Sequence, residues 1–73
     1  MSKPLKKITV KELPIRLGQF LKLANLVQDG IEASMKIQEG QVLVNGIVET
    51  RRGKKLVALD RVTIDGETWV VER

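Results

Sequence analysis

The sequence predicts a small α+β protein in which a two-helix hairpin packs on a small antiparallel sheet of β-hairpins. Two observations predict this fold: apolar residues recur with helical spacing in the first half of the chain, and the hairpin turns Asn45-Gly46 and Asp65-Gly66 divide apolar segments in the second half. The length of 73 residues suits a single domain, 1–73. A chain of this size buries only about 60% of its unfolded surface, so the core must be compact.

The first half of the chain predicts a strand followed by a helix. Residues 7–11 alternate polar and apolar side chains, which is typical of a short strand at the edge of a sheet. Pro14 follows, and from Arg16 onward apolar residues recur at the spacing of one helix face. These apolar residues are Leu17, Phe20, Leu21 and Ala24. The polar residues Arg16, Gln19 and Lys22 are therefore expected to face solvent or a ligand.

A second helix is predicted after a short loop. Asp29, followed three residues later by Glu32, has the spacing of a capping box that begins a helix. Ala33 and Ile37 would then face inward. Gly40 would end the helix, because glycine tolerates the left-handed backbone conformation. Two helices joined by a short loop form a helical hairpin.

The second half of the chain predicts two β-hairpins. Asn45-Gly46 and Asp65-Gly66 each favour a two-residue turn. In the second hairpin such a turn pairs Val62 with Trp69 and places both on the face that packs on the core, while the opposite face stays wet. The predicted strands are residues 42–44, 47–48, 61–64 and 67–71. Trp69 is interpreted as a large core residue, with base stacking as the alternative.

Positive charge is concentrated in the segment between the two hairpins, residues 51–55, which we call the basic loop. The net charge is +4, from 13 basic and 9 acidic residues. Four of the basic residues lie in this loop, and without them the remaining 9 equal the acidic ones in number. The four are Arg51, Arg52, Lys54 and Lys55. A localised positive patch attracts phosphate groups. The alternative interpretation is a solvated loop that only aids solubility.

The composition argues against an enzyme. The chain has no histidine and no cysteine, so it lacks the commonest general base and the commonest metal ligands. No pair of carboxylates stands out as an acid/base couple, and no glycine-rich phosphate loop is present. We therefore expect no catalytic residue, no metal, no cofactor and no small-molecule substrate.

The chain also shows no pattern for membrane insertion or export. Its apolar stretches are far shorter than the roughly 20 residues that cross a bilayer. The basic N-terminal segment 1–7 is not followed by the apolar region of a signal peptide. A cytoplasmic location without membrane contact is the expectation.

Residues at fixed spacings resemble the S4 (S-four) RNA-binding domain. The matching positions are 15–22, Ala33, Ile37, Gly40, 42–46 and 49–56. The last of these segments is similar to the small stand-alone subclass of YaaA/YbcJ type. The resemblance covers about residues 13–64, and segment 40–46 is its most specific part. It implies two helices packed on a small curved sheet (the αL motif), with an RNA surface formed by the helical hairpin and the adjacent loops.

The resemblance also implies which residues contact RNA. They are Arg16, Lys22, Lys36, Arg51, Arg52, Lys54 and Lys55. Three positions depart from the family pattern. Gly18 stands where many members have an acidic residue, Asp29-Gly30 where many have Ser-Arg, and Leu59-Asp60 where Gly-Asp is common. The missing arginine shifts the expected RNA contact from the helical hairpin toward the basic loop.

Together these features predict a non-catalytic RNA-binding protein that contacts the phosphate backbone of structured RNA, with ribosomal RNA and transfer RNA as candidates. Recognition by shape is favoured because no aromatic residue lies within the basic loop, and readers of single strands depend on such residues. Charge alone does not distinguish RNA from DNA. The alternative function is a protein-interaction or adaptor module that docks on an acidic partner.

Overall fold

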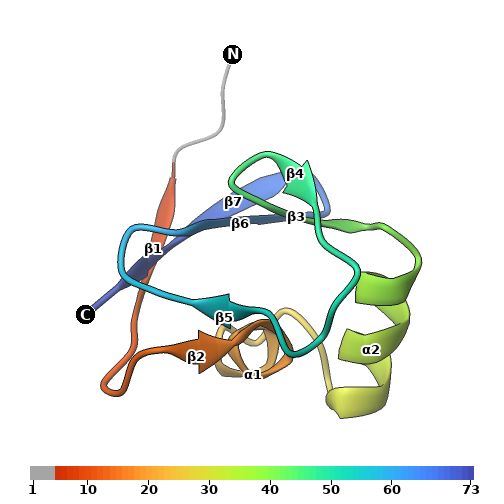
Figure 1. Cartoon of the computed structure of the whole chain (residues 1–73), viewed down its shortest axis with the longest axis horizontal. Coiled ribbons are helices and arrows are strands. Elements are labelled where there is room, and N and C mark those ends of the chain that lie inside the picture. Colours follow the sequence, from red (N-terminus) through yellow and green to blue (C-terminus); the bar gives the residue numbers. More distant parts are fainter. Residues whose placement is uncertain (1–4) are drawn as a thin grey trace.

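The structure is a computed structural model, and it describes residues 5–73 (Figure 1). Residues 1–4, part of the basic N-terminal segment, lie outside the described range. The described residues form seven strands and two helices. In chain order these are β1 (Lys6–Thr9), β2 (Ile15–Arg16), α1 (Leu17–Leu23), α2 (Gly30–Gln38), β3 (Val42–Val44), β4 (Ile47–Val48), β5 (Lys55–Leu56), β6 (Arg61–Ile64) and β7 (Glu67–Glu72).

Five of the strands form a mixed sheet in the order β1-β7-β6-β3-β4. The two predicted hairpins are β3–β4 and β6–β7, and the predicted register of Val62 with Trp69 is confirmed. The predicted antiparallel sheet of β-hairpins is confirmed for β3, β4, β6 and β7, but β1 joins it in parallel with β7, so the sheet as a whole is mixed. A hairpin turn forces its two strands to run antiparallel, but nearly the whole chain separates β1 from β7 and leaves their relative direction free.

A second, two-stranded sheet of β2 and β5 is a feature that the sequence did not indicate. It pairs Ile15 with Leu56 and Arg16 with Lys55 in antiparallel register. Each strand has two residues, too few to show an alternating pattern. The basic loop is therefore shorter than predicted, because Lys55 belongs to β5.

The helical hairpin packs against one side of the five-stranded sheet. In Figure 1 the five-stranded sheet occupies the upper part of the view, α1 lies below it beside β2 and β5, and α2 flanks the right side. The inward faces of both helices are buried as predicted, and Phe20 and Ile37 are fully inaccessible to solvent. They pack in one aliphatic cluster with Val62 and Val71 of the sheet. No helix in the described range is long and apolar enough to span a bilayer.

The helix ends follow the predicted signals. The Asp29 carboxylate accepts a hydrogen bond from the Glu32 amide at 2.8 Å and so caps α2. The Glu32 carboxylate accepts from the Gln28 amide at 2.7 Å, one residue earlier than in a standard capping box. Gly40 follows α2 with φ of +76°, the left-handed conformation expected there.

Trp69 packs against the core but is only partly buried. Lys6 lies over its ring, with Nζ 4.9 Å from the ring centroid. The prediction that Trp69 covers one face of the β6–β7 hairpin agrees with this placement.

Candidate nucleic-acid interface

The basic loop is fastened to the start of helix α1 by backbone hydrogen bonds. The Leu17 amide donates to the Lys54 carbonyl at 2.8 Å, and the Gly18 amide donates to the Arg52 carbonyl at 3.1 Å. The first amides of a helix have no acceptor within the helix, so the loop supplies acceptors that α1 needs. The adjoining β2–β5 pair adds a second attachment. Residues 34 to 41 positions apart in the sequence therefore form one surface.

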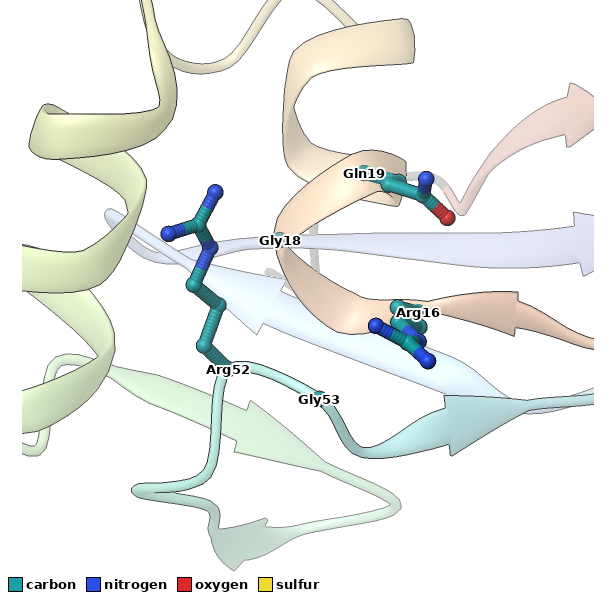
Figure 2. A pocket seen from close by; sticks show the side chains of 5 residues that line it. All are labelled: Arg16, Gly18, Gln19, Arg52 and Gly53. Atoms are coloured by element: carbon teal, nitrogen blue, oxygen red, sulfur yellow. The ribbon is translucent and has the colours of Figure 1, made fainter.

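Arg16 and Arg52 line the same hollow on this surface. The hollow has a volume of about 390 Å³, and its other lining residues are Gly18, Gln19 and Gly53 (Figure 2). Arg16 precedes α1 in extended conformation and makes no capping hydrogen bond with its side chain. Among residues 5–73 no carboxylate lies within ion-pair distance of its guanidinium, so this group can bind a ligand in the hollow.

The Arg52 side chain extends from the loop into the space between the two helices (Figure 2). Its atoms lie against the backbone of Gly18 in α1 and of Gly30 at the start of α2. Arg52 therefore presents its guanidinium on the helical hairpin, although it belongs to the loop.

Arg51 is engaged with a carboxylate, unlike its neighbour. Its Nε lies 3.0 Å from Glu49 Oε2, its Nη2 lies 3.3 Å from Oε1, and its amide donates to Oε2 at 3.0 Å. The side-chain hydrogen bonds from Arg51 lower the pKa of Glu49, and the same bonds raise the pKa of Arg51. The Glu49–Arg51 pair compensates one of the four charges of the loop.

The remaining cations of the loop border a second hollow. Lys54 and Lys55 line it together with Arg51 and Gly53, and its volume is about 480 Å³. Gly53 lines both hollows, so they adjoin at this residue. In the β2–β5 ladder Lys55 is paired with Arg16, which places the two side chains on the same side of the small sheet.

The structure separates Lys22 and Lys36 from this cluster. Lys22 lines a different hollow, where α1 faces Lys11 and Glu12. Lys36 lies in the second half of α2, with Nζ 3.3 Å from the Asp65 carboxylate. Of the seven predicted contact residues, the structure gathers five around the start of α1.

Four of these five cations remain available. No carboxylate of residues 5–73 lies within ion-pair distance of their charged nitrogens, whereas Arg51 is paired with Glu49. The four are Arg16, Arg52, Lys54 and Lys55; we call them the free cluster. Guanidinium groups bind phosphate through two parallel hydrogen bonds, and ammonium groups act as mobile point charges. Within the described range, no three histidine, cysteine or acidic side chains gather as a metal site would require.

Gly18 and Gly30 belong to this site, which the sequence did not indicate. In the sequence both are departures from a family pattern, yet in the structure both lie against the Arg52 side chain. The sequence did contain a signal, because glycine lowers the stability of a helix by about 1 kcal/mol relative to alanine, so its presence in a helix indicates a specific role. The partner of the two glycines was not visible, because Arg52 is far away in the sequence.

The fold and the site define a small α+β module with a helical hairpin, a mixed sheet and a cluster of cations beside the first helix that have no ion-pair partner in the described range. The family model described as "S4 domain" matches residues 8–72, nearly the whole chain. The protein belongs to the S4 domain family, which confirms the resemblance seen in the sequence.

Two relatives are similar over most of their length. A Bacillus subtilis protein named "Probable ribosome maturation protein RlbA" is 46% identical over 59 residues, which are 81% of this chain and 83% of the relative. An Escherichia coli protein named "Putative RNA-binding protein YbcJ" is 41% identical over 54 residues, 74% of this chain and 77% of the relative.

The fold agrees with a solved structure of the second relative. The solution structure of E. coli YbcJ superposes with a TM-score of 0.72 at 33% identity, over 97% of this chain and 91% of YbcJ. That structure is described as revealing an "ALFAL motif involved in RNA-binding". The predicted α+β fold of αL type is thereby confirmed, with the sheet corrected from antiparallel to mixed.

Proposed function

We propose that the protein binds structured RNA without catalysing a reaction, and that the free cluster holds the phosphate backbone. The observation that carries the proposal is that four cations from two distant segments meet at the start of α1 and have no ion-pair partner among residues 5–73. The name of the Escherichia coli relative supports RNA as the partner, and that of the Bacillus subtilis relative favours the RNA of the ribosome. The cytoplasm, where bacterial ribosomes are assembled, is the compartment that this proposal implies.

The placement of the aromatic residues favours structured RNA over single strands. Phe20 is fully buried in the core. Trp69, in strand β7 of the five-stranded sheet, packs against the same core. The chain has no other aromatic side chain, so none is available for bases to stack on beside the free cluster. Recognition then depends on backbone shape and charge.

Salt-dependent binding tests the proposal. The probes are a fluorescein-labelled RNA hairpin, a single-stranded RNA of the same composition and a DNA hairpin of the same sequence. About four phosphate contacts predict a slope of log affinity against log salt near −3 to −4 for the RNA hairpin. A variant with Arg52, Lys54 and Lys55 changed to alanine should lose about three contacts and have a slope near −1.

A control variant removes three cations elsewhere. Lys7 and Arg61 flank Val70 across the five-stranded sheet, and Arg73 ends the chain. Changing these three to alanine alters net charge equally but should leave most of the affinity and the slope in place. Equal losses in both variants would overturn the assignment to the free cluster. Tight binding to an acidic protein that survives nuclease treatment, without RNA binding, would favour the protein-interaction alternative.

A further inference from the structure

The two helical glycines are explained by space and not by backbone conformation. Gly18 is the second residue of α1 and Gly30 the first residue of α2, and neither has a positive φ. Alanine would therefore suit the backbone at both positions and would favour the helix. The reason for glycine must lie in what surrounds it.

A methyl group at either glycine would collide with Arg52. A Cβ at Gly18 would lie 2.9 Å from Arg52 Cγ and 3.1 Å from Nε, and a Cβ at Gly30 would lie 2.9 Å from Nη2. At Gly30 the Arg52 guanidinium supplies all the atoms within 4 Å of that Cβ position, apart from the chain neighbours and the helix's own backbone. The Arg52 side chain thus extends from α1 to α2 and occupies the space that a side chain at position 18 or position 30 would need.

We propose that Gly18 and Gly30 are positioning residues that seat Arg52 between the helices and so set its guanidinium for an RNA phosphate. This inference rests on the proposed function and names two residues that determine RNA affinity without contacting RNA. A free arginine side chain loses rotamer freedom when it binds, and this loss weakens binding. Seating Arg52 beforehand reduces that loss.

The two glycines are unequal in this role. At Gly18 the clash involves Cγ, close to the Arg52 backbone, and that backbone is held by the hydrogen bond from the Gly18 amide at 3.1 Å. Arg52 cannot retreat from a methyl group there without leaving its seat. At Gly30 the clash involves the terminal Nη2, which can swing aside. Gly18→Ala should therefore displace Arg52 more than Gly30→Ala does.

The test is a double-mutant cycle with the labelled RNA hairpin as probe. Arg52→Ala should weaken binding roughly tenfold, Gly18→Ala roughly fivefold and Gly30→Ala about threefold, as expected for the loss of one ordered charged contact. In the Arg52→Ala background, adding either glycine substitution should change affinity less than about twofold, because the seat is already empty.

A second measurement separates positioning from folding. The ¹⁵N relaxation of the Arg52 Nε–H group, recorded without RNA, should show an ordered side chain in the native protein and a mobile one in Gly18→Ala. Urea unfolding should show that both alanine variants stay folded, since alanine favours helices.

Three outcomes would overturn the inference. One is native affinity in both glycine variants while Arg52→Ala binds weakly. Another is that Gly18→Ala lowers RNA affinity by the same factor in the native background and in the Arg52→Ala background, which would mean that Gly18 acts through the stability of the fold. The third is an Arg52 side chain as mobile in the native protein as in Gly18→Ala. If Arg52→Ala and the triple alanine variant both bind RNA normally, the proposed function fails instead.

Discussion

The cations of the five-stranded sheet and those around the start of α1 differ in what they face. On the sheet, Lys6 lies 3.1 Å from the Glu67 carboxylate and Lys7 lies 3.6 Å from that of Glu72. Around α1, the free cluster has no such partner among residues 5–73. Two cations of the sheet are therefore neutralised by carboxylates of the protein, whereas four cations around α1 are left for a ligand.

The same contrast recurs between two adjacent residues of the basic loop. Arg51 turns to Glu49, and Arg52 turns to the two helices. Two arginines that are adjacent in the sequence can therefore differ in whether their charge is available to a ligand, because the fold determines the partner of each side chain.

The largest effect is expected where the loop is anchored in the core. Leu56 of β5 is fully buried, and its neighbour Val57 is half exposed. Leu56→Ala should lower the free energy of unfolding by about 2–5 kcal/mol, which approaches the whole stability expected of so small a domain. Urea unfolding followed by circular dichroism measures it. Val57→Ala, the control, should cost less than about 0.5 kcal/mol; similar midpoints would show that β5 does not anchor the loop.

The two adjacent arginines should differ clearly in RNA binding. Arg52→Ala should weaken binding to the RNA hairpin roughly tenfold, whereas Arg51→Ala should weaken it about twofold or less. The reason is that Glu49 already offsets the charge of Arg51. Fluorescence anisotropy at fixed salt gives both values, with Arg61→Ala as the control on the sheet. Equal losses from the two arginines would contradict the contrast drawn here.

The turn that joins the two regions contains a strained residue. Leu59 lies between β5 and β6 with φ of +75°, and its side chain is 77% exposed. Side chains other than glycine, asparagine and aspartate pay about 1–2 kcal/mol in this conformation. Leu59→Asn should therefore raise the free energy of unfolding by about 1 kcal/mol without changing RNA affinity. Ala58→Asn is the matched control, and an equal shift in both variants would refute the explanation by strain.

The smallest effect concerns the pH dependence of the Glu49–Arg51 pair. Hydrogen bonds from Arg51 hold the pKa of Glu49 below its ordinary value of 4.5. A carboxyl group with a lowered pKa stabilises the fold above its unfolded pKa, and this contribution disappears as the pH falls through the folded pKa. The difference in urea midpoint between the native protein and Glu49→Gln should thus be present at neutral pH and shrink below pH 4.5.

Glu49→Gln should lower the stability of the fold but raise the affinity for RNA. Glu49→Gln removes a negative charge and releases Arg51, so the affinity for the RNA hairpin should rise about twofold to threefold. A pH-independent difference in stability would show that the Glu49 charge makes no contribution to the fold. A loss of RNA affinity would show that Glu49 orients Arg51 toward the ligand.

Local features of the fold were predictable because they depend on neighbours in the chain. The Asp29 cap, the Gly40 helix end and the Asn45-Gly46 turn each follow from residues a few positions apart. The Asn45 side chain adds a link that was not predictable, because it donates to the Asp60 carboxylate at 3.1 Å and accepts from the Arg61 amide at 2.9 Å. This contact ties the first hairpin to the turn before β6.

The sequence by itself determined the helical hairpin, the two β-hairpins, the family and the concentration of charge in residues 51–55. Tertiary structure decided the parallel pairing of β1 with β7, the β2–β5 pair, and which cations remain free. The physical reason is the distance along the sequence over which each feature is determined. Turns and caps depend on residues a few positions apart, whereas the partner of a long charged side chain depends on which distant segment the fold places beside it. In the sequence, Gly18 and Gly30 are only departures from the family pattern; the structure shows that both lie against the Arg52 side chain.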